Sequence, residues 1–167
     1  MTGNGAPRSE APDCRGRRFA IVAARFYEDL ADRLIDGARR GLRDCHVDDE
    51  HVDLYQVPGC FELPLACRNL IESERFDALV ALGVVIRGET PHFDFVAGEC
   101  ARGLMGVQLA TGTPIGFGVL TTETLAQAEQ RASQSGGDKG YTAAIAAATL
   151  LHMSAAMPRA GFRRDSA

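Results

Sequence analysis

The stretch that decides the fold is residues 77–86, Asp-Ala-Leu-Val-Ala-Leu-Gly-Val-Val-Ile, which is apolar almost throughout. Such a run is typical of a strand that is covered on both faces, and strands of that kind belong to parallel sheets. Outward from this stretch, segments with strand character alternate with segments of helical periodicity. The other predicted strands are residues 18–24, 51–57 and 113–120.

Apolar residues at helical spacing predict five helices in the remaining segments. They cover residues 27–45, 60–76, 92–110, 123–133 and 141–157. Thr121 or Thr122 is the expected N-cap of the fourth helix. Short strands joined by helical crossovers must be parallel and right-handed. The sequence therefore predicts one α/β domain over residues 17–156, a three-layer sandwich around a four-stranded parallel sheet.

Composition and charge narrow the class of protein. A formal net charge of −4 over 167 residues argues against a surface that binds duplex nucleic acid, which needs clustered Lys and Arg. Residues 1–16 are expected to form a disordered leader without the apolar core of a signal peptide, and residues 157–167 a polar tail. No window approaches 18 uninterrupted apolar residues. We therefore expect a soluble, cytoplasmic protein.

The five cysteines are an odd number, widely spaced and without a C-x-x-C pair. This pattern indicates neither a disulfide framework nor a zinc site. Scattered buried thiols in a reducing compartment are the better interpretation. They are Cys14, Cys45, Cys60, Cys67 and Cys100.

Functional groups gather where the predicted strands end, which is where open α/β sheets bind ligands. After the strand at 77–86 the chain reads Arg-Gly-Glu-Thr-Pro-His-Phe-Asp-Phe over residues 87–95. Gly88, Glu89 and Thr90 precede a predicted helix, and free backbone N–H groups there suit a phosphate. His92 is either a surface residue of the first helical turn or a group that moves protons near neutral pH.

Other residues at the strand ends also allow two interpretations each. Phe26 either belongs to the core or stacks on a flat heterocycle. Glu62 either favours a helix N-terminus electrostatically or binds a ligand. Arg87 is expected to form a salt bridge with a neighbour, and Arg131 and Lys139 are expected to be solvated unless an anion lies opposite them.

Several familiar catalytic arrangements are absent from the sequence. It contains no G-x-S-x-G, P-loop or G-x-G-x-x-G pattern, and His46, His51 and His152 lack metal-ligand spacing. From the residues alone, the prediction is a site for a flat ring and a phosphate, with one histidine.

Six motifs together resemble the lumazine synthase family. They are RF (25–26), VPGCFELPLA (57–66), ALGVVIRGETPHFDFV (81–96), FGVLTTET (117–124), QRA (130–132) and GDKG (137–140), and the likeness runs from about Arg18 to Met153. The resemblance implies a flavodoxin-like fold. It also implies condensation of 5-amino-6-(D-ribitylamino)uracil with 3,4-dihydroxy-2-butanone 4-phosphate, which gives 6,7-dimethyl-8-ribityllumazine, phosphate and water without cofactor or metal. A pentamer or a multiple of pentamers is implied as well, with riboflavin synthase as a further partner.

The resemblance also implies roles for residues of the pocket itself. The ring of the pyrimidine would stack on Phe26, and His92 would shuttle protons. The remaining residues would hold the ring and the ribityl chain (Cys60, Phe61, Glu62), line the pocket (Val85, Ile86) and meet the phosphate (Gly88, Glu89, Thr90).

Three further residues would come from the adjacent subunit. Phe117 would close over the ring, Arg131 would pair with the phosphate, and Lys139 would lie nearby. The sequence departs from the family pattern at Tyr27, Cys60 and Glu89, where Asn, Ala or Ser, and Ala or Gln respectively are common.

Two alternatives to a synthase remain at this stage. One is a non-catalytic carrier of flavin or lumazine, and the other is a capsid-forming protein, a role that is compatible with catalysis. His92, Arg131 and Lys139 argue against the carrier, because a carrier of the dephosphorylated product has no use for a phosphate clamp.

Overall fold

The computed structural model describes residues 10–157. Four parallel strands form one sheet in the order β2-β1-β3-β4. They are β1 (Phe19–Ala24), β2 (Val52–Val57), β3 (Ala78–Ile86) and β4 (Ile115–Thr122). In the register, Phe19 lies opposite both Val52 and Ala78, and Leu79 lies opposite Ile115. The predicted four-stranded parallel sheet is confirmed, and its strand order is that of flavodoxin-like folds.

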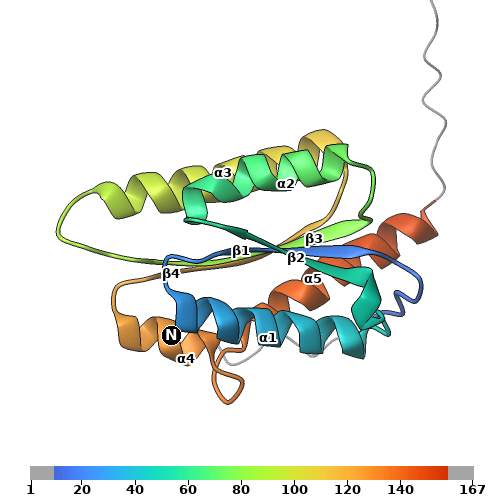
Figure 1. Ribbon diagram of the computed structural model, residues 1–167, viewed down its shortest axis with the longest axis horizontal. Coiled ribbons are helices and arrows are strands. Elements are labelled where there is room, and N and C mark those ends of the chain that lie inside the picture. The colour runs from blue at the N-terminus through green and yellow to red at the C-terminus, as the bar shows by residue number, and fades with distance from the viewer. Residues whose placement is uncertain (1–9, 158–167) are drawn as a thin grey trace, which may run out of the picture.

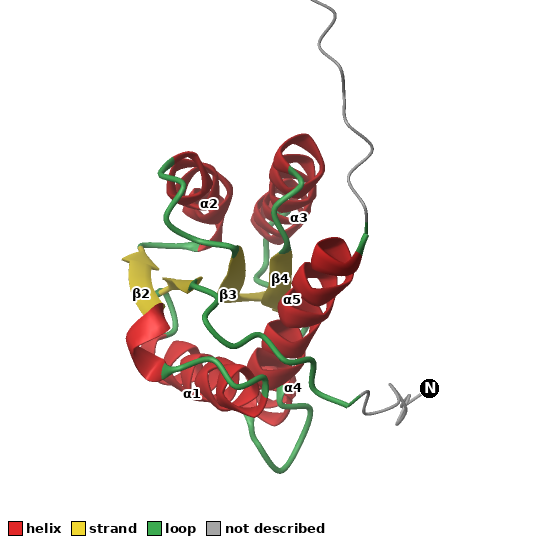
Figure 2. Cartoon of the chain, turned by 90° about the vertical axis from the view of Figure 1, so that its right-hand side faces the viewer, coloured by secondary structure: helices red, strands yellow, loops and turns green. Residues whose placement is uncertain are grey.

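Helices cover both faces of the sheet (Figures 1 and 2). One layer contains α1 (Glu28–Asp44), α4 (Leu125–Ala132) and α5 (Lys139–Ala156), and the other contains α2 (Leu63–Glu72) and α3 (His92–Thr111). Two 3₁₀ turns, η1 (Asp49–His51) and η2 (Cys60–Glu62), precede β2 and α2. The three-layer α/β sandwich predicted from the sequence is confirmed.

The core lies on both sides of the sheet because the central strands are buried on both faces. In β1, Phe19 and Ile21 face the layer of α1 and α5, whereas Ala20 and Val22 face α2 and α3. Leu34 and the other large core residues are fully buried, and each such side chain contributes about 1.5–3 kcal/mol relative to exposure. Because successive side chains of β1 point to opposite faces, both helical layers pack against the same sheet.

The second helix differs most from its predicted extent. The second helix was expected to reach residue 76, but α2 ends at Glu72, and Glu74 adopts a left-handed φ of 57° that a helix cannot continue. Phe76, the last residue of the predicted helix, is instead buried from a loop and meets Tyr55 edge-on at 5.9 Å. Its apolar character reports burial, not helical periodicity.

The fourth helix has a different cap from the one expected. Thr121 and Thr122 are the last residues of β4, and α4 is capped by Thr124, whose hydroxyl accepts a hydrogen bond from the Gln127 amide at 3.2 Å. Thr122 is buried and donates its hydroxyl proton to the Thr124 carbonyl at 3.0 Å. The strand runs further because β-branched residues suit it.

Part of the segment expected to be a leader is packed on the domain. Cys14 is buried, and its backbone amide donates a 2.8 Å hydrogen bond to the carbonyl of Cys45 at the end of α1. The remainder of the expected leader, residues 1–9, lies outside the described residues. The same holds for residues 158–167 of the expected tail. Within residues 10–157, no helix is both long enough and apolar enough to cross a membrane.

Candidate active site

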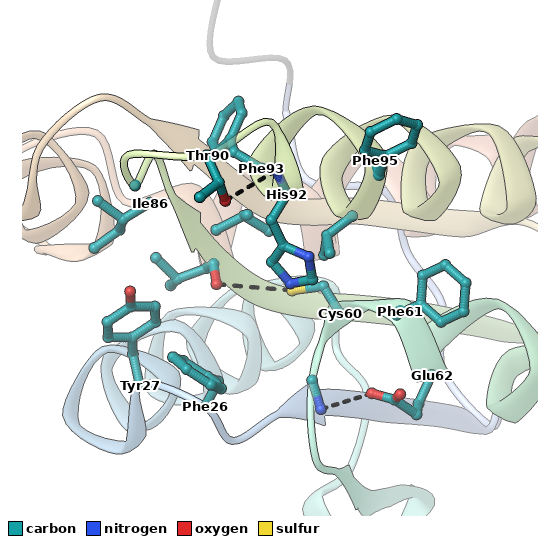
Figure 3. Close-up of a pocket in the computed structure, with 15 residues that line it drawn as sticks. Phe26, Tyr27, Cys60, Phe61, Glu62, Ile86, Thr90, His92, Phe93 and Phe95 are labelled. Atoms are coloured by element: carbon teal, nitrogen blue, oxygen red, sulfur yellow. Dashed lines mark hydrogen bonds between the residues drawn. The ribbon is translucent and has the colours of Figure 1, made fainter.

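A pocket of about 580 Å³ opens beyond the carboxyl ends of β1, β2 and β3 (Figure 3). The chain leaves β1 toward the layer of α1, and it leaves the adjacent strand β3 toward the layer of α3. Connections that diverge from neighbouring strands leave a crevice at that point, which is where such sheets bind ligands. The pocket therefore lies where the topology predicts.

Nine of the thirteen residues expected at the site line this pocket. They come from the β1–α1 connection, η2, the end of β3 and the start of α3, and they are Phe26, Cys60, Phe61, Glu62, Val85, Ile86, Gly88, Thr90 and His92. The structure thus brings together residues that are widely separated in the sequence.

Two aromatic rings form the wall contributed by the β1–α1 connection. Phe26 is 75% exposed, which rules out the interpretation that it belongs to the core. Its ring meets Tyr27 edge-on, with 5.1 Å between the ring centroids. An aromatic face that is held in place but open to solvent is suited to stacking on a planar ligand.

The turn η2 contributes backbone groups, a carboxylate and a thiol. Glu62 accepts a 2.9 Å hydrogen bond from the Gly59 amide, which closes the turn and fixes the carboxylate at the rim. The Cys60 thiol donates to the carbonyl of Val84 at 3.8 Å. A hydrogen bond from the Cys100 thiol lowers the pKa of Cys60, and the same contact together with burial raises the pKa of Cys100.

His92 is the first residue of α3, and its exposed side chain lines the pocket. Its backbone amide donates a long, 3.5 Å hydrogen bond to the Thr90 hydroxyl. The loop of Gly88 and Thr90 thus leads directly into a helix N-terminus, where backbone N–H groups and the helix dipole favour an anion.

Arg87 holds this loop in place, as the sequence predicted. Its guanidinium pairs with Asp94 at 3.1 Å and with Glu123 at 3.0 Å. It also lies 4.3 Å from the centre of the Phe93 ring. The two carboxylates raise the pKa of Arg87, so its charge is engaged by α3 and by the connection between β4 and α4.

Four of the expected site residues lie outside the pocket lining. Glu89 is exposed on the loop. Phe117 lies within β4, opposite Ala81, and the strand continues beyond it to Thr122.

The two expected phosphate cations lie on the other helical layer. Arg131 is in the last turn of α4 and donates to the Gln127 carbonyl at 3.2 Å, and Lys139 is the first residue of α5. No Lys or Arg appears among the described residues that line the pocket. Within residues 10–157 of one chain, the pocket therefore lacks a Lys or Arg to pair with a phosphate.

The pocket also includes residues that sequence reasoning did not assign to it. Phe93, Phe95 and Val96 are the additional apolar side chains from α3, and Gly59 and Val84 complete the lining next to Cys60. The sequence pattern that could have indicated Phe93, Phe95 and Val96 is the PHFDFV segment, where aromatic residues alternate with polar ones close to a strand end. Nowhere in residues 10–157 do three His, Cys, Asp or Glu side chains form a group that could hold a metal ion.

Comparison with known proteins identifies the family. The sequence model of the 6,7-dimethyl-8-ribityllumazine synthase family matches residues 16–155. A 6,7-dimethyl-8-ribityllumazine synthase of Halorhodospira halophila is 48% identical over 136 residues, which cover 81% of this chain and 87% of that protein. The enzyme of the same name from Syntrophus aciditrophicus is 43% identical over 139 residues, covering 83% and 90% respectively. The chain belongs to the 6,7-dimethyl-8-ribityllumazine synthase family.

Proposed function

We propose that the pocket binds the pyrimidine and the ribityl chain, and that a neighbouring copy of the chain completes the site for the phosphate. The protein is a lumazine synthase, a transferase of riboflavin biosynthesis. It condenses 5-amino-6-(D-ribitylamino)uracil with 3,4-dihydroxy-2-butanone 4-phosphate to 6,7-dimethyl-8-ribityllumazine, phosphate and water, which is the penultimate step of the pathway.

The charge of the pocket lining is the main support for a site that is shared between two chains. Glu62 is negative, and no Lys or Arg lies among the described lining residues. A phosphate monoester carries close to two negative charges, and sites for it combine backbone N–H donors with a guanidinium or ammonium group. The loop at Gly88 and Thr90 supplies donors only, so the cation must come from elsewhere. Arg131 and Lys139, both exposed, are the proposed source.

Exposed apolar surface supports association of identical chains. Met105 and Leu109 on α3 and Phe117 on the edge strand β4 are 53%, 76% and 48% exposed. A hollow of about 190 Å³ lies between α3 and β4, lined by Ala101, Leu104, Met105, Gln108, Ile115 and Phe117. Exposed apolar patches of this kind mark interaction surfaces. The resemblance of the motifs to the family leads us to propose a pentamer or a multiple of pentamers.

In the proposed mechanism the substrate supplies the nucleophile. The exocyclic amine of the pyrimidine attacks the ketone to form an imine with loss of water, and phosphate is then eliminated. The ribitylamino nitrogen attacks the remaining carbonyl, and the ring closes with loss of a second water. Phe26 stacks on the pyrimidine, Glu62 and the turn η2 hold the ring and the ribityl chain, and His92 transfers protons. Most of the acceleration comes from the orientation of two reactants, which explains why the sequence needs no catalytic triad.

A cytoplasmic location is part of the proposal. All five cysteines of the chain are free, although several lie in the same core clusters. Free thiols persist in reducing compartments. An association with riboflavin synthase stays a prediction that a co-purification experiment would test.

The test of the shared site uses two impaired variants. His92→Ala and Arg131→Ala are dissociated under mild denaturant, mixed and reassembled, and lumazine formation is measured on assemblies whose mixed composition is confirmed by mass. Some interfaces then receive both defects and others receive neither, so the mixture should exceed the activity of either parent. If confirmed mixed assemblies never exceed the average of the two parents, the site lies within one chain.

A further inference from the structure

The connection between α4 and α5 carries a proposed phosphate-binding side chain at each end. Arg131 lies in the last turn of α4, and Lys139 opens α5. Between them, Asp138 adopts a left-handed backbone with φ 42° and ψ 52°. Residues other than glycine adopt this conformation at an energetic cost, which is smaller for Asp than for most, and contacts of the side chain can stabilise it. What holds Asp138 therefore also determines the direction in which the chain enters α5.

Asp138 is held by Arg40, which projects from α1. Two parallel hydrogen bonds join the guanidinium to the carboxylate at 2.9 and 3.0 Å, and the Arg40 Nε donates to Asp36 at 3.0 Å. The side chains of Arg40 and Asp138 are only 24% and 19% exposed. A two-pronged pair of this kind fixes orientation as well as distance, and Asp138 raises the pKa of Arg40 further above its ordinary value.

The backbones around this pair are in direct contact. A Cβ on Gly37 would lie 2.7 Å from the Asp138 carboxylate, and one on Gly140 would lie 2.0 Å from the Leu34 carbonyl. Because α1 and the start of α5 touch without intervening side chains, a displacement at Asp138 has no compressible layer to absorb it.

Backbone hydrogen bonds connect the segment around Asp138 to the residues next to Arg131 and to the helix that begins at Lys139. The Asp138 amide donates to the Ser133 carbonyl at 3.1 Å, and the Gly137 amide donates to the Gln130 carbonyl, next to Arg131, at 3.0 Å. On the other side, the Thr142 amide donates to the Asp138 carbonyl at 3.0 Å and starts the helix that Lys139 opens. One carboxylate thus lies at the centre of the segment that orients Arg131 and Lys139.

We infer that Arg40 is a positioning residue for the phosphate-bearing substrate, acting through Asp138 on Lys139 and Arg131 without touching the substrate. Arg40 has a second effect, because it neutralises a carboxylate directly adjacent to Lys139. Without Arg40, that carboxylate would compete with the phosphate for the lysine. The inference rests on the proposed function, in which Arg131 and Lys139 bind phosphate.

The test is steady-state kinetics of the assembled enzyme with each substrate varied in turn. Arg40→Met should raise KM for the phosphate-bearing substrate about tenfold, as expected when binding groups are displaced. The KM for the pyrimidine and kcat at saturation should change by less than about twofold, since those contacts lie on other elements. Arg40→Lys keeps the charge but loses the two-pronged geometry, so its KM should lie between those of the wild type and Arg40→Met.

A matched control lies on the same helix. Arg43, also on α1, donates two hydrogen bonds of 2.9 and 3.1 Å to the carboxylate of Asp49, which lies beyond the end of the helix. Arg43→Met should leave both KM values unchanged. The double variant Arg40→Met with Asp138→Asn removes the uncompensated carboxylate as well, and its phosphate-substrate KM should fall below that of Arg40→Met, because only the geometric defect remains.

Three outcomes overturn the inference. In the first, Arg131→Ala raises the phosphate-substrate KM but Arg40→Lys and Arg40→Met do not, which leaves the proposed function intact. In the second, both KM values rise together in the Arg40 variants, which indicates a general loss of structure. In the third, neither Arg131→Ala nor Lys139→Ala affects the phosphate substrate, and then the proposed phosphate site fails together with the inference. If Arg40→Met does not assemble, Arg40→Lys decides.

Discussion

At the scale of the residue, His92 is the group in the pocket whose proposed role is chemical. Replacing it with Ala should slow turnover by about 10²-fold, the lower end of the range of proton-transfer catalysis. Activity should not vanish, because Phe26, η2 and the loop at Gly88 still orient the reactants. Lumazine formation measured across neutral pH checks this. An unchanged rate and pH profile would return His92 to the role of a surface residue in the first turn of α3.

A second prediction concerns Cys60, which lines the pocket. The pKa of this thiol is lowered by Cys100, whereas burial raises the pKa of Cys45 and Cys67 to about 12. Since the thiolate is the reactive form, Cys60 should be the first cysteine to react with a small haloacetamide, and bound pyrimidine should slow that reaction. Peptide mass spectrometry after a time course measures it.

The control for this prediction is the protein unfolded in urea, in which all five cysteines should react at similar rates. Modification of Cys14, Cys45 or Cys67 before Cys60 in the folded protein would contradict the assignment of the reactive thiol.

At the scale of the element, Thr124 determines where α4 begins. Thr124→Ala removes the acceptor for the Gln127 amide and should lower the free energy of unfolding by about 1 kcal/mol. Thr124→Ser keeps the hydroxyl and should lie close to the wild type. Denaturation in urea at one fixed protein concentration gives both values, since assembly would otherwise change the apparent stability. Equal stability of the Ala and Ser variants would mean that the cap contributes nothing.

The elements differ in how well the sequence predicts them. β1 and β3 were predicted to within a residue at each end, because strands buried on both faces leave an unbroken apolar run. The end of α2 and the burial of Phe76 were not predictable, since a buried aromatic looks the same on a helix face and in a packed loop. The contact between Cys60 and Cys100 was equally hidden, because it depends on how η2 packs against α3.

The residues of the candidate site also differ in how well the sequence predicts them. Residues that follow a strand end directly, such as Phe26 and His92, reached the pocket because topology alone brings strand ends together. Arg131 lies in the last turn of a helix and Lys139 follows a loop, and nothing in the spacing of the sequence states which surface they face. Their proposed role depends on a neighbouring copy, which only the resemblance to the family suggested.

At the scale of the whole molecule, assembly and activity should fail together. Phe117→Glu places a charge at a half-exposed aromatic on the β4 edge, which is proposed to lie at an interface. Light scattering should show smaller species, and activity should fall strongly, while circular dichroism shows that the fold is kept. Phe117→Tyr keeps the ring and serves as the control. Full activity of a fully assembled Phe117→Glu variant would place the interface elsewhere.

The glycine contact between α1 and α5 has a consequence for how this sequence drifts over time. At Gly37 and Gly140 even a methyl group meets backbone or carboxylate atoms at 2.0–2.7 Å, so lineages that keep this arrangement keep glycine at both positions. Arg40 and Asp138 are expected to change together, because loss of Arg40 leaves the Asp138 carboxylate without its partner and loss of Asp138 leaves Arg40 with Asp36 alone. We therefore expect substitutions at these two positions, which are distant in the sequence, to occur together.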